Sequence, residues 1–340
     1  MDKIRGVLYG QAIGDALGLP AEFKSAKAIQ IMRKDWGAWP DAYHATGRSR
    51  NSWQAGEWSD DTEQALCILD AYIQGIREGA DPKSPMDLLL VADYFVRWAQ
   101  TNGRGMGNHT WTVLQDTLFL VDPHVVSMAV WEQSGKNAAP NGAVMRTAYM
   151  GILHPDDLDW TARESARVAQ TTHYDPRCVA STVAVSTTIA ALVGGSLTIP
   201  EAIQVGIDYG QRHHGEVEKY ATLSLKELHL DEGIDQTPAI RKAPIGYTYK
   251  CMGAGFWALQ ELVKECDAVP GFALHPGVRQ DLFTKVLQKV ILAGGDADTN
   301  GAVAGAMLGA AVGFRGIPPH LIEGLFDRQQ LESRLSLLPR

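Results

Sequence analysis

The chain has 340 residues, of which 45% are hydrophobic and 21% are charged, and its formal net charge is -8 at pH 7. This is the composition of an ordinary globular protein that is long enough to bury a large core. The acidic balance argues against a nucleic-acid partner, because phosphate backbones are themselves negative. The cysteines form no C-x-x-C pair, so they predict neither a zinc site nor a disulfide framework: Cys67, Cys178, Cys251 and Cys266.

The sequence predicts a cytoplasmic protein without a membrane partner. Residues 1–18 lack an apolar core followed by a cleavage site, so they do not resemble a signal peptide. The run from Gly301 to Phe314, taken as the longest without a charged residue, is too short to span a bilayer.

Apolar residues recur at three- and four-residue spacing along most of the chain, a pattern that predicts amphipathic helices. Alternating strand patterns are scarce, and no repeat or linker divides the chain, although the polar stretch Asp231–Lys242 is expected to be an exposed excursion. We therefore expect an all-α fold in a single domain, residues 1–340. The clearest helical patterns, in chain order, are Ala65–Ile76, Met86–Trp98, Ala162–Ala169, Val179–Leu192, Ala254–Val263 and Leu282–Leu292.

A further helix is predicted after Asp298, and glycine recurs along it at every fourth position. The four residues are Gly301, Gly305, Gly309 and Gly313. Glycine costs about 1 kcal/mol relative to alanine inside a helix. Such a stripe therefore predicts close backbone contact with a neighbouring helix.

Two acidic segments stand at the starts of predicted helices: Ser59–Thr62 (SDDT) and Gly294–Asn300 (GGDADTN). Residues of these types cap helices by accepting hydrogen bonds from free backbone N–H groups, which explains one carboxylate per helix. A second carboxylate adds repulsion that capping does not require. Oxygen-only donor sets suit Mg²⁺ or Mn²⁺, so we favour a divalent-cation site that both segments share.

Several glycine-rich loops precede predicted helices. The loop Gly103–Asn108 precedes a helix expected over His109–Phe119, and Pro140–Arg146 repeats the design. Glycine lets the backbone approach a ligand, and the first N–H groups of a helix bind phosphate. Asp15 interrupts an apolar helix face, where we expect it to form hydrogen bonds between helices. Glu22 follows the Gly18-Leu19-Pro20 turn that ends this helix.

The order of the motifs resembles that of the ADP-ribosylglycohydrolases, a family that includes the bacterial dinitrogenase reductase-activating glycohydrolase and its animal relatives. The resemblance extends from residue 4 to about residue 315. It rests on Gly10–Phe23 (GQAIGDALGLPAEF), Trp58–Gln64 (WSDDTEQ), Gly107–Thr110 (GNHT), Asn141–Arg146 (NGAVMR), Thr172–Pro176 (THYDP) and Gly294–Asn300 (GGDADTN).

This resemblance implies a compact orthogonal all-α domain with two Mg²⁺ or Mn²⁺ ions between the acidic segments. The implied metal ligands are Ser59, Asp60, Asp61, Asp296, Asp298 and Thr299, where Ser59 replaces the threonine of many members. The implied catalytic groups are Glu22, on a mobile loop over the metals, Asp60, Asp61 and Asp298, and which of them transfers the proton is left open. The implied substrate contacts are Gly105, Gly107, Asn141, Gly142, His173 and Tyr247.

The function implied is metal-dependent hydrolysis of the N- or O-glycosidic bond between ADP-ribose and an acceptor, on a protein or a small conjugate. ADP-ribosyl-arginine is the first expectation, because the SDDT and NGAVMR motifs are similar to those of the bacterial arginine-directed branch. ADP-ribosyl-serine, another conjugate and a different metallohydrolase of the same fold stay open. The alternative that the protein is a non-catalytic structural member of the family also stays open, although the presence of all four aspartates argues against it.

Overall fold

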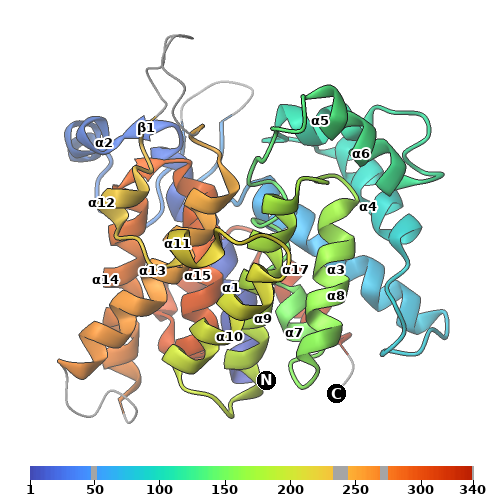
Figure 1. The fold of residues 1–340 in the computed structure, drawn as a ribbon. Coiled ribbons are helices and arrows are strands. Elements are labelled where there is room, and N and C mark those ends of the chain that lie inside the picture. The colour runs from blue at the N-terminus through green and yellow to red at the C-terminus, as the bar shows by residue number, and fades with distance from the viewer. Residues whose placement is uncertain (47–51, 233–243, 269–274, 339–340) are drawn as a thin grey trace.

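A computed structural model describes residues 1–46, 52–232, 244–268 and 275–338, and helices dominate this part of the chain (Figure 1). The first half contains α1 (Asp2–Gly18), η1 (Leu19–Ala21), β1 (Lys24–Ser25), α2 (Ala26–Met32), η2 (Arg33–Asp35), α3 (Asp60–Arg77), α4 (Leu88–Thr101), α5 (Asn108–Leu114), α6 (Pro123–Gln133), α7 (Met150–Leu153) and α8 (Leu158–Gln170). The second half contains α9 (Pro176–Gly194), α10 (Ile199–Gln211), α11 (Val217–Ala221), α12 (Leu225–Leu228), α13 (Thr248–Asp267), α14 (Pro276–Leu292), β2 (Gly294–Gly295), α15 (Ala297–Val312), η3 (Phe314–Gly316), α16 (Pro319–Gly324) and α17 (Arg328–Leu335). The all-α prediction is confirmed.

The two helices at the centre of the fold, α1 and α15, pack backbone against backbone (Figure 1). Each carries glycine at every fourth position along the shared face. A Cβ atom added at Gly10 would collide with the carbonyl oxygen of Gly305, and one added at Gly14 would collide with that of Gly301. The predicted close contact is therefore confirmed, and the partner helix is α1, which contributes glycines of its own to the contact.

One member of the predicted stripe does not belong to it. Gly313 follows the last residue of α15, Val312, and has a φ of 73°. A Cβ atom there would meet the carboxylate of Asp2, not the facing helix. Gly313 thus ends the helix with a positive φ that glycine adopts without strain, and its inclusion in the helical stripe was wrong.

A second boundary also differs from the prediction. The helix expected over His109–Phe119 is α5, which begins at Asn108 and ends at Leu114. Beyond it the carboxylate of Asp116 accepts a hydrogen bond from the Leu118 backbone N–H, which stabilises a turn in place of further helix. Most of the polar stretch 231–242 lies outside the described residues.

Helix α9 corrects one step of the membrane argument. Residues 178–200 carry no charged side chain, so the run from Gly301 to Phe314 is not the longest uncharged one. Among the described helices, α9 is long and apolar enough to cross a bilayer by length and composition, but 83% of its apolar window is buried. It packs against α8, α10 and α13, as a central core helix does.

A two-residue antiparallel ladder ties the end of α1 to the start of α15. Lys24 of β1 is the partner of Gly295 in β2, and Ser25 is the partner of Gly294. The backbone N–H of Phe23 also donates to the Gly295 carbonyl oxygen at 2.7 Å. The ladder places Glu22 beside the second acidic segment, over the end of the α1–α15 contact.

The glycine contact predicts a large difference between two helical glycine-to-alanine substitutions. Gly10→Ala should lower the free energy of unfolding by at least about 2 kcal/mol, because two backbones must separate to admit the methyl group. Gly75→Ala in α3, where nothing lies within 4 Å of the added Cβ, should raise it by up to about 1 kcal/mol. Urea denaturation measures both, and equal effects would contradict the packing argument.

Candidate metal centre and substrate cleft

The first acidic segment is held at the start of α3 by Asp15 of α1. The Asp15 carboxylate accepts hydrogen bonds from the backbone N–H of Ser59 at 2.9 Å and of Thr62 at 3.1 Å, and from the Thr62 hydroxyl at 2.7 Å. The predicted bonding of Asp15 between helices is confirmed. Because Asp15 satisfies these free N–H groups, the carboxylates of Asp60 and Asp61 are left to line the cleft.

The second segment surrounds the start of α15. Asp296 is the residue before the helix, and Asp298 and Thr299 lie in its first turn. The Asn141 side-chain amide donates to Asp296 Oδ2 at 2.7 Å. Asn141, predicted to contact the substrate and not the metal, therefore also orients a carboxylate of the cluster.

Two groups of carboxylates, one from each side of the cluster, meet at Asp298. In one group, oxygens of Asp15, Asp61 and Asp298 lie within 4.8 Å of one another, and in the other, oxygens of Glu22, Asp296 and Asp298 do. Asp61 Oδ1 is buried and has no hydrogen-bond partner. Oxygen-only groups of this kind, with an unpaired buried acceptor, fit hard divalent cations.

Asp60, Ser59 and Thr299, the other predicted ligands, lie around these groups. Asp60 belongs to neither group: its Oδ2 accepts a hydrogen bond from Gln64 at 2.8 Å, and its Oδ1 lies beneath Gly105. The Ser59 hydroxyl donates to Asp61 Oδ2 at 3.1 Å. Thr299 lines the cleft one residue after Asp298.

Burial and mutual repulsion make the cluster reluctant to ionise without a cation. Burial, followed by the charge of Asp296, raises the pKa of Glu22 to about 7. Burial raises the pKa of Asp15 to about 6 against opposing hydrogen bonds from Ser59 and Thr62. Burial and neighbouring carboxylates place the pKa values of Asp60, Asp61 and Asp298 well above the usual range. Bound cations would reverse these shifts.

A cleft of about 280 Å³ opens over the cluster. Gly105 has a φ of 84°, and its missing side chain leaves room for Asp60. A Cβ at Gly142 would lie 2.9 Å from the His173 ring, so glycine is needed for that ring to approach. The cleft is lined by Glu22, Phe23, Asp60, Asp61, Gly105, Gly107, Asn108, His109, Thr110, Pro140, Asn141, Gly142, Met145, His173, Asp296, Asp298 and Thr299.

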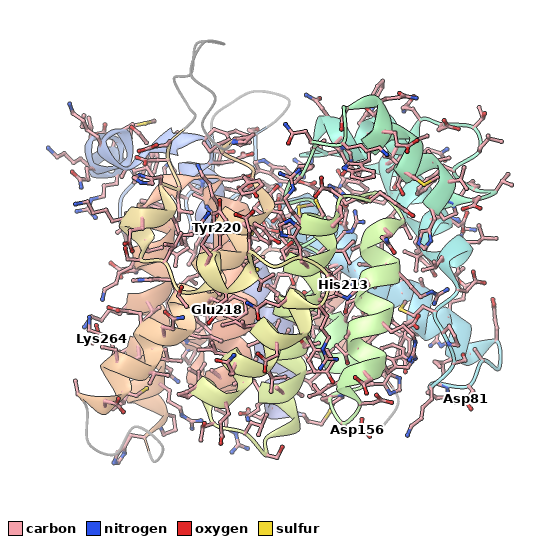
Figure 2. All side chains as sticks on the ribbon, in the orientation of Figure 1. Asp81, Asp156, His213, Glu218, Tyr220 and Lys264 are labelled. Carbon is pink, nitrogen blue, oxygen red and sulfur yellow. The ribbon has the colours of Figure 1, made fainter. Side chains whose placement is uncertain are left out.

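Tyr247 lies outside this cleft, in an adjacent cavity of about 690 Å³ that shares His109 and Pro140 with it. The ring centroids of Tyr247 and Tyr220 are 5.8 Å apart. Tyr220 comes from α11 (Figure 2). The Arg177 guanidinium carbon lies 5.9 Å from the Tyr247 ring centroid. A cation and aromatic rings beside the acidic cleft suit the phosphate and base of a nucleotide.

The sequence reading missed several residues of the two cavities. His109 and Thr110 belong to the quoted GNHT motif but have no role in the sequence prediction, and Arg177 directly follows the quoted THYDP motif. The GNHT motif could have indicated a role for His109 and Thr110. No local pattern marks Tyr220, which reaches the cavity because α11 packs against α13.

The pKa shifts predict how stability depends on pH and on cations. Because the folded pKa values of Asp15 and Glu22 exceed the ordinary values of 3.8 and 4.5, their contribution to stability is full below those values. It is lost as the pH rises through about 6 and 7. The metal-free protein should therefore melt at lower temperature at pH 7 than at pH 5. Mg²⁺ at 100 times its Kd should add about 2.7 kcal/mol.

Calorimetric melting with and without Mg²⁺ checks both effects, and Asp298→Asn serves as the matched variant. It removes the carboxylate that both groups share, so it should show a weaker pH dependence and no stabilisation by Mg²⁺. Stabilisation of this variant equal to that of the wild type would contradict the cation site.

Comparisons with known proteins identify the family to which the chain belongs. A family model described as ADP-ribosylglycohydrolase matches residues 1–339. The chain is 24% identical to ADP-ribosylarginine hydrolase Tri1 of Serratia proteamaculans, over 98% of this chain and 78% of that one. It is 24% identical to the ADP-ribosyl-(dinitrogen reductase) glycohydrolase of Rhodospirillum rubrum, over 98% and 93%. A solved structure titled ADP-ribosylglycohydrolase-related protein complex matches with a TM-score of 0.63 and 25% identity, over 99% and 96%.

Proposed function

Because this chain belongs to the ADP-ribosylglycohydrolase family, we propose that it hydrolyses ADP-ribose from modified arginine side chains of proteins, with two divalent cations in the acidic cluster. The observation that carries the proposal is the arrangement of the acidic side chains. Two sets of three carboxylates share Asp298, at a cleft beside a cavity lined by aromatic and basic residues. Two of the similar proteins are named for ADP-ribosyl-arginine and ADP-ribosyl-dinitrogen reductase, which supports this substrate class.

The arrangement divides the proposed substrate between the two cavities. The terminal ribose, with the bond to be broken, would lie in the 280 Å³ cleft next to Asp60, Asp61 and Asp298. The pyrophosphate and adenine would extend past His109 toward Arg177 and Tyr247. Arg177 is held in place by Asp175, which accepts two hydrogen bonds of 2.8 Å from its guanidinium group.

The ligands proposed for the cations are Asp61, Asp296 and Asp298, with Ser59, Asp60 and Thr299 around them. Bound there, divalent cations would neutralise the cluster, orient the ribose hydroxyls and acidify water in the cleft. The remaining chemistry belongs to side chains of the chain itself. Glu22 lies over the cluster with no hydrogen bond from a protein donor among the described contacts, so its carboxylate is free to accept the proton of the attacking water. The bond at the anomeric carbon breaks through an oxocarbenium-like transition state, which the surrounding carboxylates stabilise.

Glu22→Gln should separate this role from a structural one. The substitution retains shape and removes the basic group, so turnover should fall by about 10²–10⁴-fold. The melting temperature of the metal-free protein should not fall, because the raised pKa shows that the charge of Glu22 is already disfavoured in the fold. Steady-state kinetics and melting measure the two effects.

A change in Mn²⁺ affinity in the same Glu22→Gln variant would identify Glu22 as a covering ligand of the cations, whereas an unchanged affinity identifies it as the base. Wild-type turnover would show that Glu22 has neither role. Lys27→Gln is the control, because Lys27 is exposed in the adjacent α2 and lines neither cavity.

The acceptor is tested by comparing peptides that carry ADP-ribosyl-arginine and ADP-ribosyl-serine, each with and without Mg²⁺. We expect release of ADP-ribose from the arginine peptide, and loss of that release in excess chelator. Faster release from the serine peptide would move the assignment to O-linked conjugates. Absence of release from both, together with normal Mg²⁺ stabilisation, would favour a different substrate for the same metal site.

A further inference from the structure

Arg146 is a buried cation whose hydrogen bonds go to neutral groups. Its side chain is fully buried, and burial lowers its pKa to about 9, so it remains charged at neutral pH. Nη1 donates to Gln64 Oε1 at 2.9 Å, and Nη2 donates to the Thr172 hydroxyl at 2.6 Å. No ion pair of Arg146 with a carboxylate is found among the described residues. A charge buried in this way is costly, so stability alone does not account for it.

The Gln64 contact determines how Asp60 is held. Arginine only donates hydrogen bonds, so the oxygen of the Gln64 amide must face Arg146 and its nitrogen must face the other way. That nitrogen donates to Asp60 Oδ2 at 2.8 Å. Arg146 therefore sets the amide orientation that holds Asp60 with Oδ1 against Gly105 at the edge of the cleft.

The Thr172 contact determines which nitrogen of His173 carries a proton. The buried Thr172 hydroxyl accepts from Arg146, and among the described contacts the only acceptor for its own hydrogen is His173 Nδ1, which lies 2.7 Å away. Nδ1 is then an acceptor, and the proton of the neutral ring is on Nε2. Nε2 lies against Gly142 in the wall of the cleft. His173 stays neutral, because burial and the charges of His109 and Arg146 place its pKa well below the usual range.

We propose that Arg146 is a positioning residue that orients Asp60 through Gln64 and, through Thr172, makes His173 a hydrogen-bond donor to the substrate. One guanidinium group would thereby orient a side chain on the cation side of the cleft and another on its sugar side. The inference rests on the proposed function for the identity of the two groups bound there: the cation beside Asp60 and the substrate beside His173. The orientation of the two side chains themselves follows from the hydrogen bonds alone.

Substitutions in the two arms test the proposal separately. Gln64→Met interrupts the path to Asp60, Thr172→Val interrupts the path to His173, and Arg146→Met interrupts both. Thr172→Ser retains the hydroxyl and should behave as the wild type. Arg97→Met is the arginine control, because Arg97 is exposed and its ion pair is with Asp93, in neither arm.

Two measurements on the folded protein without substrate provide the result. Titration calorimetry with Mn²⁺ should show at least a 10-fold loss of affinity in Gln64→Met and Arg146→Met, but not in Thr172→Val. Long-range ¹H–¹⁵N spectra of histidine-labelled protein, assigned with His173→Gln, should show a single Nε2–H tautomer in the wild type. A tautomer mixture is expected in Thr172→Val and Arg146→Met only.

The proposal is overturned if folded Gln64→Met binds Mn²⁺ as the wild type does, or if His173 keeps its tautomer in Thr172→Val. Should Arg146→Met fail to fold, the two single-arm variants still decide. Neither measurement involves hydrolysis, so the positioning role and the proposed activity can fail independently. A loss of melting temperature without either change would assign Arg146 a structural role only.

Discussion

The contact between the glycine faces of α1 and α15 is the constraint on which the site depends. Because Gly10 and Gly14 admit the carbonyl oxygens of α15, the two helices approach more closely than any side chain would allow. The same contact ends with Gly18 against the backbone of Asp298. Residues from the start of the chain, Asp15 and Glu22, are thereby placed beside carboxylates from near its end.

The concentrated negative charge then explains much of the chemistry around it. Carboxylates brought together in a buried place raise one another's pKa values and destabilise the metal-free protein at neutral pH. The fold offsets part of this by giving two of the carboxylates a side-chain amide donor: Asn141 for Asp296 and Gln64 for Asp60. Asp61 Oδ1 has none, and the imbalance that remains is what divalent cations would satisfy.

The substrate side of the cleft differs from the acidic side, because its hydrogen-bond donors are held in fixed orientations and are uncharged. His173 and His109 have pKa values lowered first by burial, so both rings are uncharged near neutral pH. Charge is supplied at a distance by Arg177 in the adjacent cavity and by the buried Arg146. Donors that are already oriented need little rearrangement during the reaction, which is a main source of catalytic power in enzymes.

The helical class, the main helices, the two acidic segments and the family could all be predicted from the sequence, because each of these leaves a local signal. Apolar spacing marks α3, α9 and α13, and the SDDT and GDADT motifs stand at helix starts that the structure confirms. The glycine recurrence predicted a close helix contact without naming its partner.

Which segments meet in space could not be predicted from the sequence and depends on how the helices pack. The β1–β2 ladder has two residues in each strand, too few for an alternating pattern to appear in the sequence. The capping of α3 by Asp15 and the bonds of Arg146 to Gln64 and Thr172 join residues that are 26 to 82 positions apart. Such partners are chosen by helix packing, which local periodicity does not encode, and for that reason the carboxylates could be identified from the sequence but their grouping around Asp298 could not.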